Sequence, residues 1–135
     1  MNVQRIAVIG SIAAVAAAVV VGLAITGSPA EQRLLRLDEQ RVAELQQLVG
    51  RAEGRWERDG RLPDTADDLV DGQFLTRLPT DPSTGQPYEY RITRPRQFEV
   101  CATFDRASRP DLAGDFWFHE AGQRCFAFDL SERRD

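Results

Sequence analysis

Two cysteines and a single histidine are the residues of this chain whose chemistry extends beyond packing and charge. Cys101 and Cys125 are the only cysteines and lie 24 residues apart, with the only histidine, His119, between them. A dithiol redox site usually holds its thiols two residues apart at a helix start, and a structural zinc site needs four ligands. The set therefore favours a structural disulfide, with a thiol redox site as the alternative.

Other routes to catalysis are weakly supported. His119 precedes Glu120, a pair that could move a proton, but a lone histidine in such a position is more often a turn residue bonded to backbone or water. Asp64, Asp67 and Asp68 suit a helix start better than the alternating pattern of a calcium loop. Nucleophile-elbow, phosphate-loop, HExxH and dinucleotide motifs do not occur. We predict no catalytic residue, no cofactor-binding residue and no metal ligand.

Segments with a two-residue period position the cysteines. The pattern predicts antiparallel strands at 88–92, 97–104, 116–119 and 125–130. Cys101 lies opposite the strand face that carries Phe98, and Cys125 lies opposite the face that carries Phe126. If these two strands are neighbours, both thiols share the face away from the aromatic side chains. We expect a Cys101–Cys125 disulfide, which would stabilise the fold by roughly 3 kcal/mol.

An uncharged apolar segment precedes the folded part. It runs from Ile6 to Thr26, and about 20 residues at about 1.5 Å each span a hydrocarbon layer about 30 Å thick. We predict a short tail at 1–5, a transmembrane helix at 6–27 and a periplasmic domain at 28–135. A cleaved signal is the alternative, because Arg5 precedes the segment and small residues follow it, although a signal core usually has about 7 to 15 residues.

The orientation of this helix is decided by the cysteines. Arg5 lies before the segment and Arg33 and Arg36 lie soon after it, so the count of basic residues does not favour a cytoplasmic N-terminus. A disulfide needs an oxidising compartment. We therefore predict a single-pass protein of the bacterial inner membrane, with its C-terminal domain in the periplasm.

An amphipathic helix is predicted after the apolar segment, from Glu31 to about Arg58. Its apolar residues recur at three- and four-residue steps, as in Leu34, Leu37, Val42, Leu45, Leu48, Val49, Ala52 and Trp56. With Pro29 at a helix start or kink, one near-continuous helix from Ile6 to Arg58 is expected. The predicted fold class is α+β: a long N-terminal helix, with a membrane half and an amphipathic half, packed on a small antiparallel sheet of three to four strands.

The charge of the chain limits its partners. The net charge is -4, and because Arg5 is the only charge before residue 31, the remainder carries -5. This argues against binding of nucleic acid, which needs a basic surface. We expect the lipid bilayer as one partner, and a protein partner or a second copy of the chain as another.

The order of the motifs resembles type IV pilin-like proteins, in particular the major pseudopilin of type II secretion systems. The resemblance rests on the apolar helix, its amphipathic extension, and the segments 61–64, 69–75, 78–82 and 85–90, including Leu78-Pro79-Thr80-Asp81-Pro82. It implies that this turn joins the helical half to the sheet and that the apolar helix packs subunits into a filament. The fold expected from the resemblance is the same helix-on-sheet arrangement.

The chain departs from that family in the signal for filament assembly. The family is cleaved after a Gly, usually before Phe or Met, with a Glu five residues into the mature helix, whereas here Ser11 follows Gly10 and Val15 occupies the Glu position. The family's calcium loop has no counterpart in 105–115. We predict a non-catalytic, membrane-anchored periplasmic pilin-like domain that acts through protein contacts. The alternatives are a minor pseudopilin of a type II secretion or pilus-like assembly, and a periplasmic thiol, redox or other enzyme.

Overall fold

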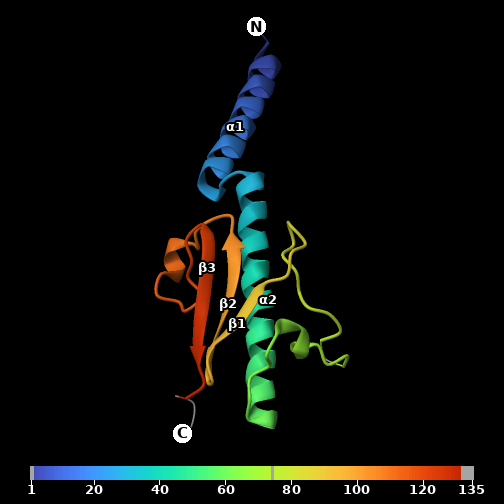
Figure 1. Ribbon diagram of the computed structural model, residues 1–135. Coiled ribbons are helices and arrows are strands. Elements are labelled where there is room, and N and C mark those ends of the chain that lie inside the picture. The colour runs from blue at the N-terminus through green and yellow to red at the C-terminus, as the bar shows by residue number, and fades with distance from the viewer. Residues whose placement is uncertain (1, 74, 132–135) are drawn as a thin grey trace. The chain divides into compact units, whose positions relative to one another are not determined.

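The structure is a computed structural model that describes residues 2–73 and 75–131. The main elements are helices α1 (Val3–Thr26) and α2 (Pro29–Asp59) and strands β1 (Glu89–Arg94), β2 (Gln97–Phe104) and β3 (Gly122–Asp129) (Figure 1). Two short 3-10 helices, η1 (Ala66–Leu69) and η2 (Pro110–Leu112), lie in the connections. The chain divides into two compact units, Met1–Arg33 and Leu34–Asp135, which are described separately.

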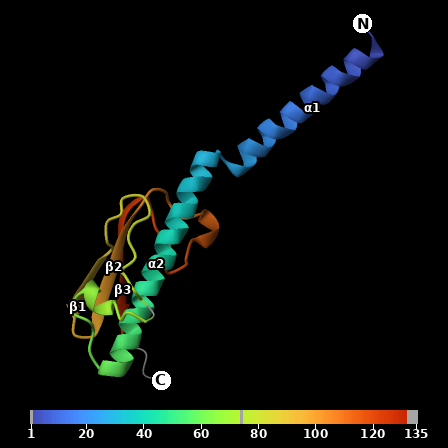
Figure 2. The same cartoon turned by 90° about the vertical axis from the view of Figure 1, so that its right-hand side faces the viewer.

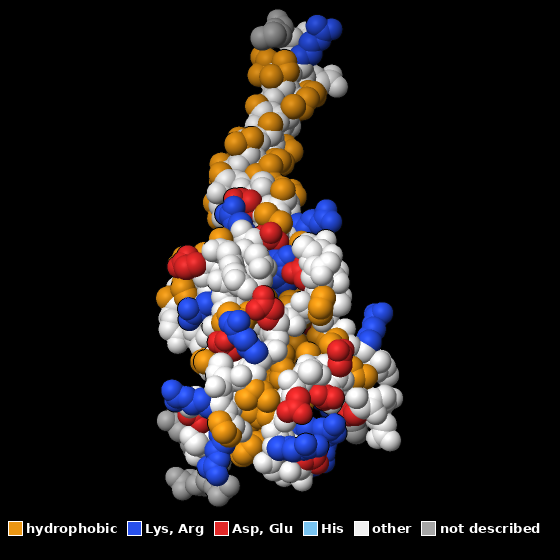
Figure 3. Space-filling view, viewed as in Figure 1, with side chains coloured by type: hydrophobic (Ala, Val, Ile, Leu, Met, Phe, Trp, Pro, Cys, Tyr) orange, Lys and Arg blue, Asp and Glu red, His pale blue; other side chains and the backbone are white. Residues whose placement is uncertain are grey.

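Helix α1 is apolar on every side. Eleven of its large apolar side chains between Val3 and Ile25 are about half exposed or more, and none of its most apolar 18-residue window, of mean hydropathy 2.6, is buried. Its one internal hydroxyl, of Ser11, donates to the carbonyl of Ala7 at 2.9 Å. Length and composition therefore suit a membrane span, and they suit a secretory signal as well. Hydrophobic side chains cover α1 in the space-filling view (Figure 3).

A two-residue break separates α1 from α2. The helix begins at Val3, within the expected tail, and ends at Thr26. Gly27 follows with a φ of 79°, which a residue with a side chain rarely adopts. Ser28 then accepts from the Glu31 amide through its hydroxyl at 3.2 Å, while the Ser28 amide donates to the Glu31 carboxylate at 3.4 Å. This capping box, with Pro29 in the first turn, restarts the helix.

Helix α2 buries one stripe against a three-stranded sheet in the unit Leu34–Asp135, with the helix on one side of the sheet (Figure 2). The shared core includes residues of α2, of the connection between helix and sheet, and of the strands: Leu45, Leu48, Val49, Ala52, Leu62, Leu69, Leu75, Tyr88, Phe98, Val100, Ala102, Phe104, Phe126 and Leu130. The fold is α+β, as predicted from the helical and strand periods, and the layout is consistent with pilin-like architecture.

The sheet has the order β1-β2-β3 and is antiparallel throughout. The predicted strand at 116–119 is wrong: these residues form turns. Asp115 accepts from the Trp117 amide through its carboxylate at 2.7 Å and from the Phe118 amide through its carbonyl at 3.1 Å. This local bonding outcompetes the strand tendency of three successive aromatic residues. Trp117 instead packs on Phe126, with ring centroids 4.7 Å apart.

Candidate functional site

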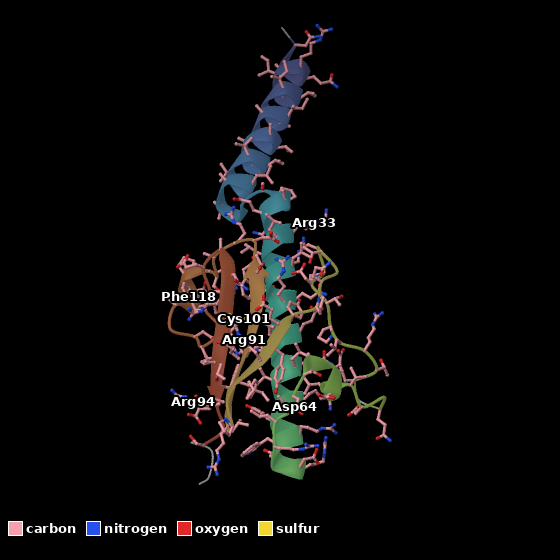
Figure 4. The ribbon with its side chains drawn as sticks, in the orientation of Figure 1. Arg33, Asp64, Arg91, Arg94, Cys101 and Phe118 are labelled. Carbon is pink, nitrogen blue, oxygen red and sulfur yellow. A yellow bond between two sulfur atoms is a disulfide. The ribbon has the colours of Figure 1, made fainter. Side chains whose placement is uncertain are left out.

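The disulfide lies in the middle of the outer face of the sheet. Cys101 of β2 and Cys125 of β3 are directly opposite in the register and are joined, with Cα atoms 4.0 Å apart. Phe98 and Phe126 point to the other face, as the alternation along the strands requires. Arg91 lies on the disulfide face and donates towards the Cys125 sulfur at 3.9 Å (Figure 4).

The surroundings of the disulfide suit a structural bond. In thiol–disulfide exchange one sulfur is attacked and the other leaves as a thiolate. Cys125 is the more accessible sulfur and would be attacked, so Cys101 would have to leave, yet Cys101 is 2% exposed. The guanidinium of Arg91 contacts Cys125 and not Cys101. Burial without a positive charge disfavours a Cys101 thiolate.

His119 is a buried residue of the connection between β2 and β3. Its ring stacks on Phe104 with centroids 3.6 Å apart, and its backbone exchanges hydrogen bonds with Ser108: the His119 amide donates to the hydroxyl at 3.0 Å and the Ser108 amide to the His119 carbonyl at 2.8 Å. Burial lowers its pKa, against the opposing effect of the Glu120 carbonyl. His119 therefore anchors the connection as a neutral ring.

Asp68, one of the acids after α2, stabilises local structure. The Asp68 carboxylate accepts from the Thr65 amide at 3.0 Å and from the Thr65 hydroxyl at 2.9 Å, which begins η1. Within residues 2–73 and 75–131, no three acidic, cysteine or histidine side chains form an arrangement that could hold a metal ion.

A buried arginine is the main polar feature that the sequence did not reveal. Arg41 of α2 is 2% exposed and contacts three carboxylates from three parts of the unit. Its guanidinium donates to Asp81 at 2.6 and 3.3 Å, to Asp38 at 2.6 Å and to Asp105 at 2.6 Å. Ser83 accepts a further bond at 3.1 Å. We call these four charged residues, Arg41, Asp38, Asp81 and Asp105, the Arg41 cluster.

The Arg41 cluster joins helix, turn and sheet. The Asp81 carboxylate also accepts from the amides of Ser83 and Thr84, at 2.8 and 2.9 Å, which shapes the turn after Pro79. Asp38 accepts from the amides of Asp105 and Arg106, at 3.0 and 2.8 Å, where the chain leaves β2. The helix thus fixes the entry to the sheet through Asp81 and the exit from β2 through Asp38.

These bonds shift the pKa values of Asp81 and Arg41. Burial alone would raise the pKa of Asp81, but the bonds from Arg41, Thr84 and Ser83 lower it to about 2. Burial alone would lower the pKa of Arg41, but its bonds to Asp81, Asp105 and Asp38 raise it above its ordinary value. By residue type, the cluster has one basic and three acidic side chains, a formal net charge of -2.

Spacing in the sequence could have indicated this cluster. Asp38 and Arg41 lie three residues apart and continue the buried stripe of Leu45, Leu48 and Ala52 towards the start of α2. Charged residues at positions of an apolar stripe require buried partners. The partners, however, come from residues 40 and 64 positions further along the chain, and periodicity gives no information about such pairings.

A groove with mainly apolar walls lies beside the cluster, between α2 and the connection from β2 to β3. It encloses about 260 Å³. One wall comes from α2: Leu35, Asp38, Glu39, Val42 and Gln46. The other wall comes from the connection: Ala107, Ser108, Arg109, Leu112, Asp115, Trp117, Phe118 and His119. Aromatic and aliphatic walls with a few carboxylates are typical of a binding surface.

A wider hollow lies on another side of α2. It measures about 560 Å³ and is lined by Gln40, Glu44, Gln47, Leu75, Thr76, Arg77, Leu78, Pro79, Thr80 and Pro82. Many of these side chains are hydrophilic, and water solvates them well. The smaller groove, in which apolar surface is exposed, is therefore the stronger candidate for binding.

Comparison of the chain with protein-family models, with curated proteins and with solved structures found no match. The pilin-like resemblance therefore rests on the layout of the elements.

Proposed function

We propose that this chain is a single-pass protein of the bacterial inner membrane whose pilin-like periplasmic domain acts through protein contacts and carries out no reaction. The observation that supports it most directly is the exposure of α1. Eleven large apolar side chains that remain in contact with water cost more than about 10 kcal/mol together, so a bilayer is their natural environment.

The disulfide supports the periplasmic location. Disulfides persist in oxidising compartments and are rare in the cytosol, so Cys101–Cys125 fits a domain on the outer side of the inner membrane. The burial of Cys101 and the anchored, neutral His119 favour structural roles for both residues over a thiol or acid–base enzyme.

A pair of arginine substitutions in α1 tests the anchor. An arginine at the centre of a span costs about 2.5 to 3.5 kcal/mol, whereas one near the end reaches the interface. Val15→Arg should therefore deplete the chain from carbonate-washed membranes, and Val3→Arg, the matched control, should leave it there. Equal retention of both variants would contradict the proposal.

The mass of the membrane-bound protein tests processing at the same time. An intact N-terminus is expected. Loss of the residues up to about Ala30 would indicate a cleaved signal, and loss of the residues up to Gly10 would indicate maturation as a pseudopilin. The cysteines should resist alkylation before reduction, and two alkylated thiols in the native protein would contradict the periplasmic location.

A further inference from the structure

We propose that the groove between α2 and the connection 105–121 binds an arginine or lysine side chain that a partner protein carries on an apolar segment. The inference rests on the proposed function, because it assigns the protein contact to one surface and one chemistry of partner. Three properties of the groove support it: its size, its walls and its charge.

Size and walls favour a peptide side chain. The groove volume of about 260 Å³ lies below the roughly 300 to 1,000 Å³ of sites for whole small molecules, so it suits one or two side chains. Val42 and Trp117 offer apolar contact for the stem of a long side chain. At the rim, Leu112 is 40% exposed, and the neighbouring Phe116 is 54% exposed. This surface would pack against apolar residues that flank the basic one.

The charge of the groove walls favours a positively charged occupant. Glu39 is exposed and makes no hydrogen bond or ion pair within the described residues. Asp115 accepts from the Trp117 amide with one carboxylate oxygen, and its second oxygen can accept from a bound cation. Arg109 is the one basic residue in the walls, and Asp111 lies 3.7 Å from it. The Arg41 cluster, whose Asp38 forms part of the wall, adds its net charge of -2.

The same charges disfavour the other occupants. Anionic lipid headgroups would meet two acidic rim residues and an acidic cluster. A second copy of the domain carries a net charge of -5, so two copies repel each other. A guanidinium gains instead from the carboxylates of Glu39 and Asp115 and from the indole of Trp117.

Binding of a designed peptide tests the inference on the full chain in phosphatidylcholine nanodiscs. The probe is a fluorescent peptide, acetyl-Ala-Leu-Arg-Leu-Ala-amide, and the comparison peptide carries citrulline, which has the shape of arginine without its charge. We expect the arginine peptide to bind about fivefold more tightly at low salt, with the difference shrinking as salt screens the carboxylates. Equal affinities would overturn the inference.

Two charge-neutralising substitutions in α2 locate the contact. Glu39→Gln should lower the affinity for the arginine peptide about three- to fivefold. Glu57→Gln, the same change at an exposed position outside the groove, should leave this affinity unchanged. Asp115→Asn, which keeps the acceptor for the Trp117 amide, should act like Glu39→Gln. Equal effects of Glu39→Gln and Glu57→Gln would overturn the inference, as would self-association of the chain without peptide binding.

The peptide experiments can fail without failure of the proposed membrane anchor, and the reverse also holds. Failure of peptide binding by a protein that is membrane-bound and disulfide-closed would refute only the groove. Peptide binding by a protein whose span has been cleaved would refute only the anchor.

Discussion

Replacement of the buried arginine is the sharpest test of how this domain is held together. In an Arg41→Met variant the carboxylates of Asp38 and Asp81, whose side chains are 4% and 11% exposed, lose their positive partner. Both would remain surrounded by protein, with only backbone amides to stabilise their charges. Removing one partner of a buried ion pair is strongly destabilising because the remaining charge is left uncompensated.

The magnitude follows from the individual contacts. The pKa of Asp81 falls from 3.8 to about 2, which corresponds to about 2 kcal/mol, part of which comes from the amides of Ser83 and Thr84. The Asp105 side chain is 41% exposed, so its pair contributes about 1 kcal/mol or less. With the loss at Asp38, we expect the free energy of unfolding to fall by about 3 to 5 kcal/mol. For a domain of about 100 residues, 4 kcal/mol lowers the Tm by about 15 to 30 °C.

Urea unfolding of the full chain in detergent micelles, with the disulfide intact, measures this loss. Both tryptophans, Trp56 and Trp117, lie in the unit Leu34–Asp135, so their fluorescence reports on that unit. Arg58→Met is the control, because the same substitution at an exposed position of α2 should cost about 0.5 kcal/mol or less.

A double-mutant cycle separates charge from packing. Asp81→Asn should cost less in the Arg41→Met background than in the wild type, with a coupling of about 2 kcal/mol. A cost of Arg41→Met equal to that of Arg58→Met, or additive effects in the cycle, would refute the reasoning.

Three further perturbations have expected outcomes from the same contacts. Cys101→Ala with Cys125→Ala should lower the free energy of unfolding by roughly 3 kcal/mol, measured by urea unfolding, and no change would contradict a stabilising bond. Because the pKa of His119 is lowered in the fold, its contribution to the free energy of unfolding should be complete above about pH 6.5 and be lost as the pH drops through the folded pKa. His119→Gln should remove this dependence of the unfolding free energy on pH between about pH 7 and 5. An unchanged dependence would show that other groups cause it. Phe98→Ala empties a site that is 0% exposed and should cost about 3 to 5 kcal/mol, whereas a cost below about 1 kcal/mol would show that the core collapses around it.

The sequence predicted those features that depend on local spacing. Alternation along 97–104 placed Cys101 away from the aromatic face, and the three- and four-residue steps in α2 predicted the buried positions Leu45 and Leu48. Both results follow because a strand or helix fixes which residues share a face. Ser28-Pro29-Ala30-Glu31 has the spacing of a capping box, a local signal that the expectation of one near-continuous helix did not use.

Two features were not predicted, one for a local reason at 116–119 and one because distant residues pair at Arg41. The strand expected at 116–119 failed because the Asp115 carboxylate bonds the Trp117 amide, and the groove arises where that connection meets α2. Asp38 and Arg41 are not among the apolar positions that predicted the amphipathic helix, so the helical period gave no sign of their burial. Only the fold brings Asp81 and Asp105 to them, and these carboxylates compensate the desolvation of the guanidinium.

The position of the Arg41 cluster links the stability of the domain to the proposed binding surface. Asp38 belongs to the cluster, forms part of the groove wall, and binds the amides of Asp105 and Arg106, where the opposite wall begins. An apolar contact at this position would hold the helix to the sheet equally well, but it would bond no amide and would place no negative charge beside the groove. A buried ionic cluster costs desolvation that apolar packing avoids. Asp38 is therefore shared by both features: it holds the helix to the exit from β2, and it lines the groove.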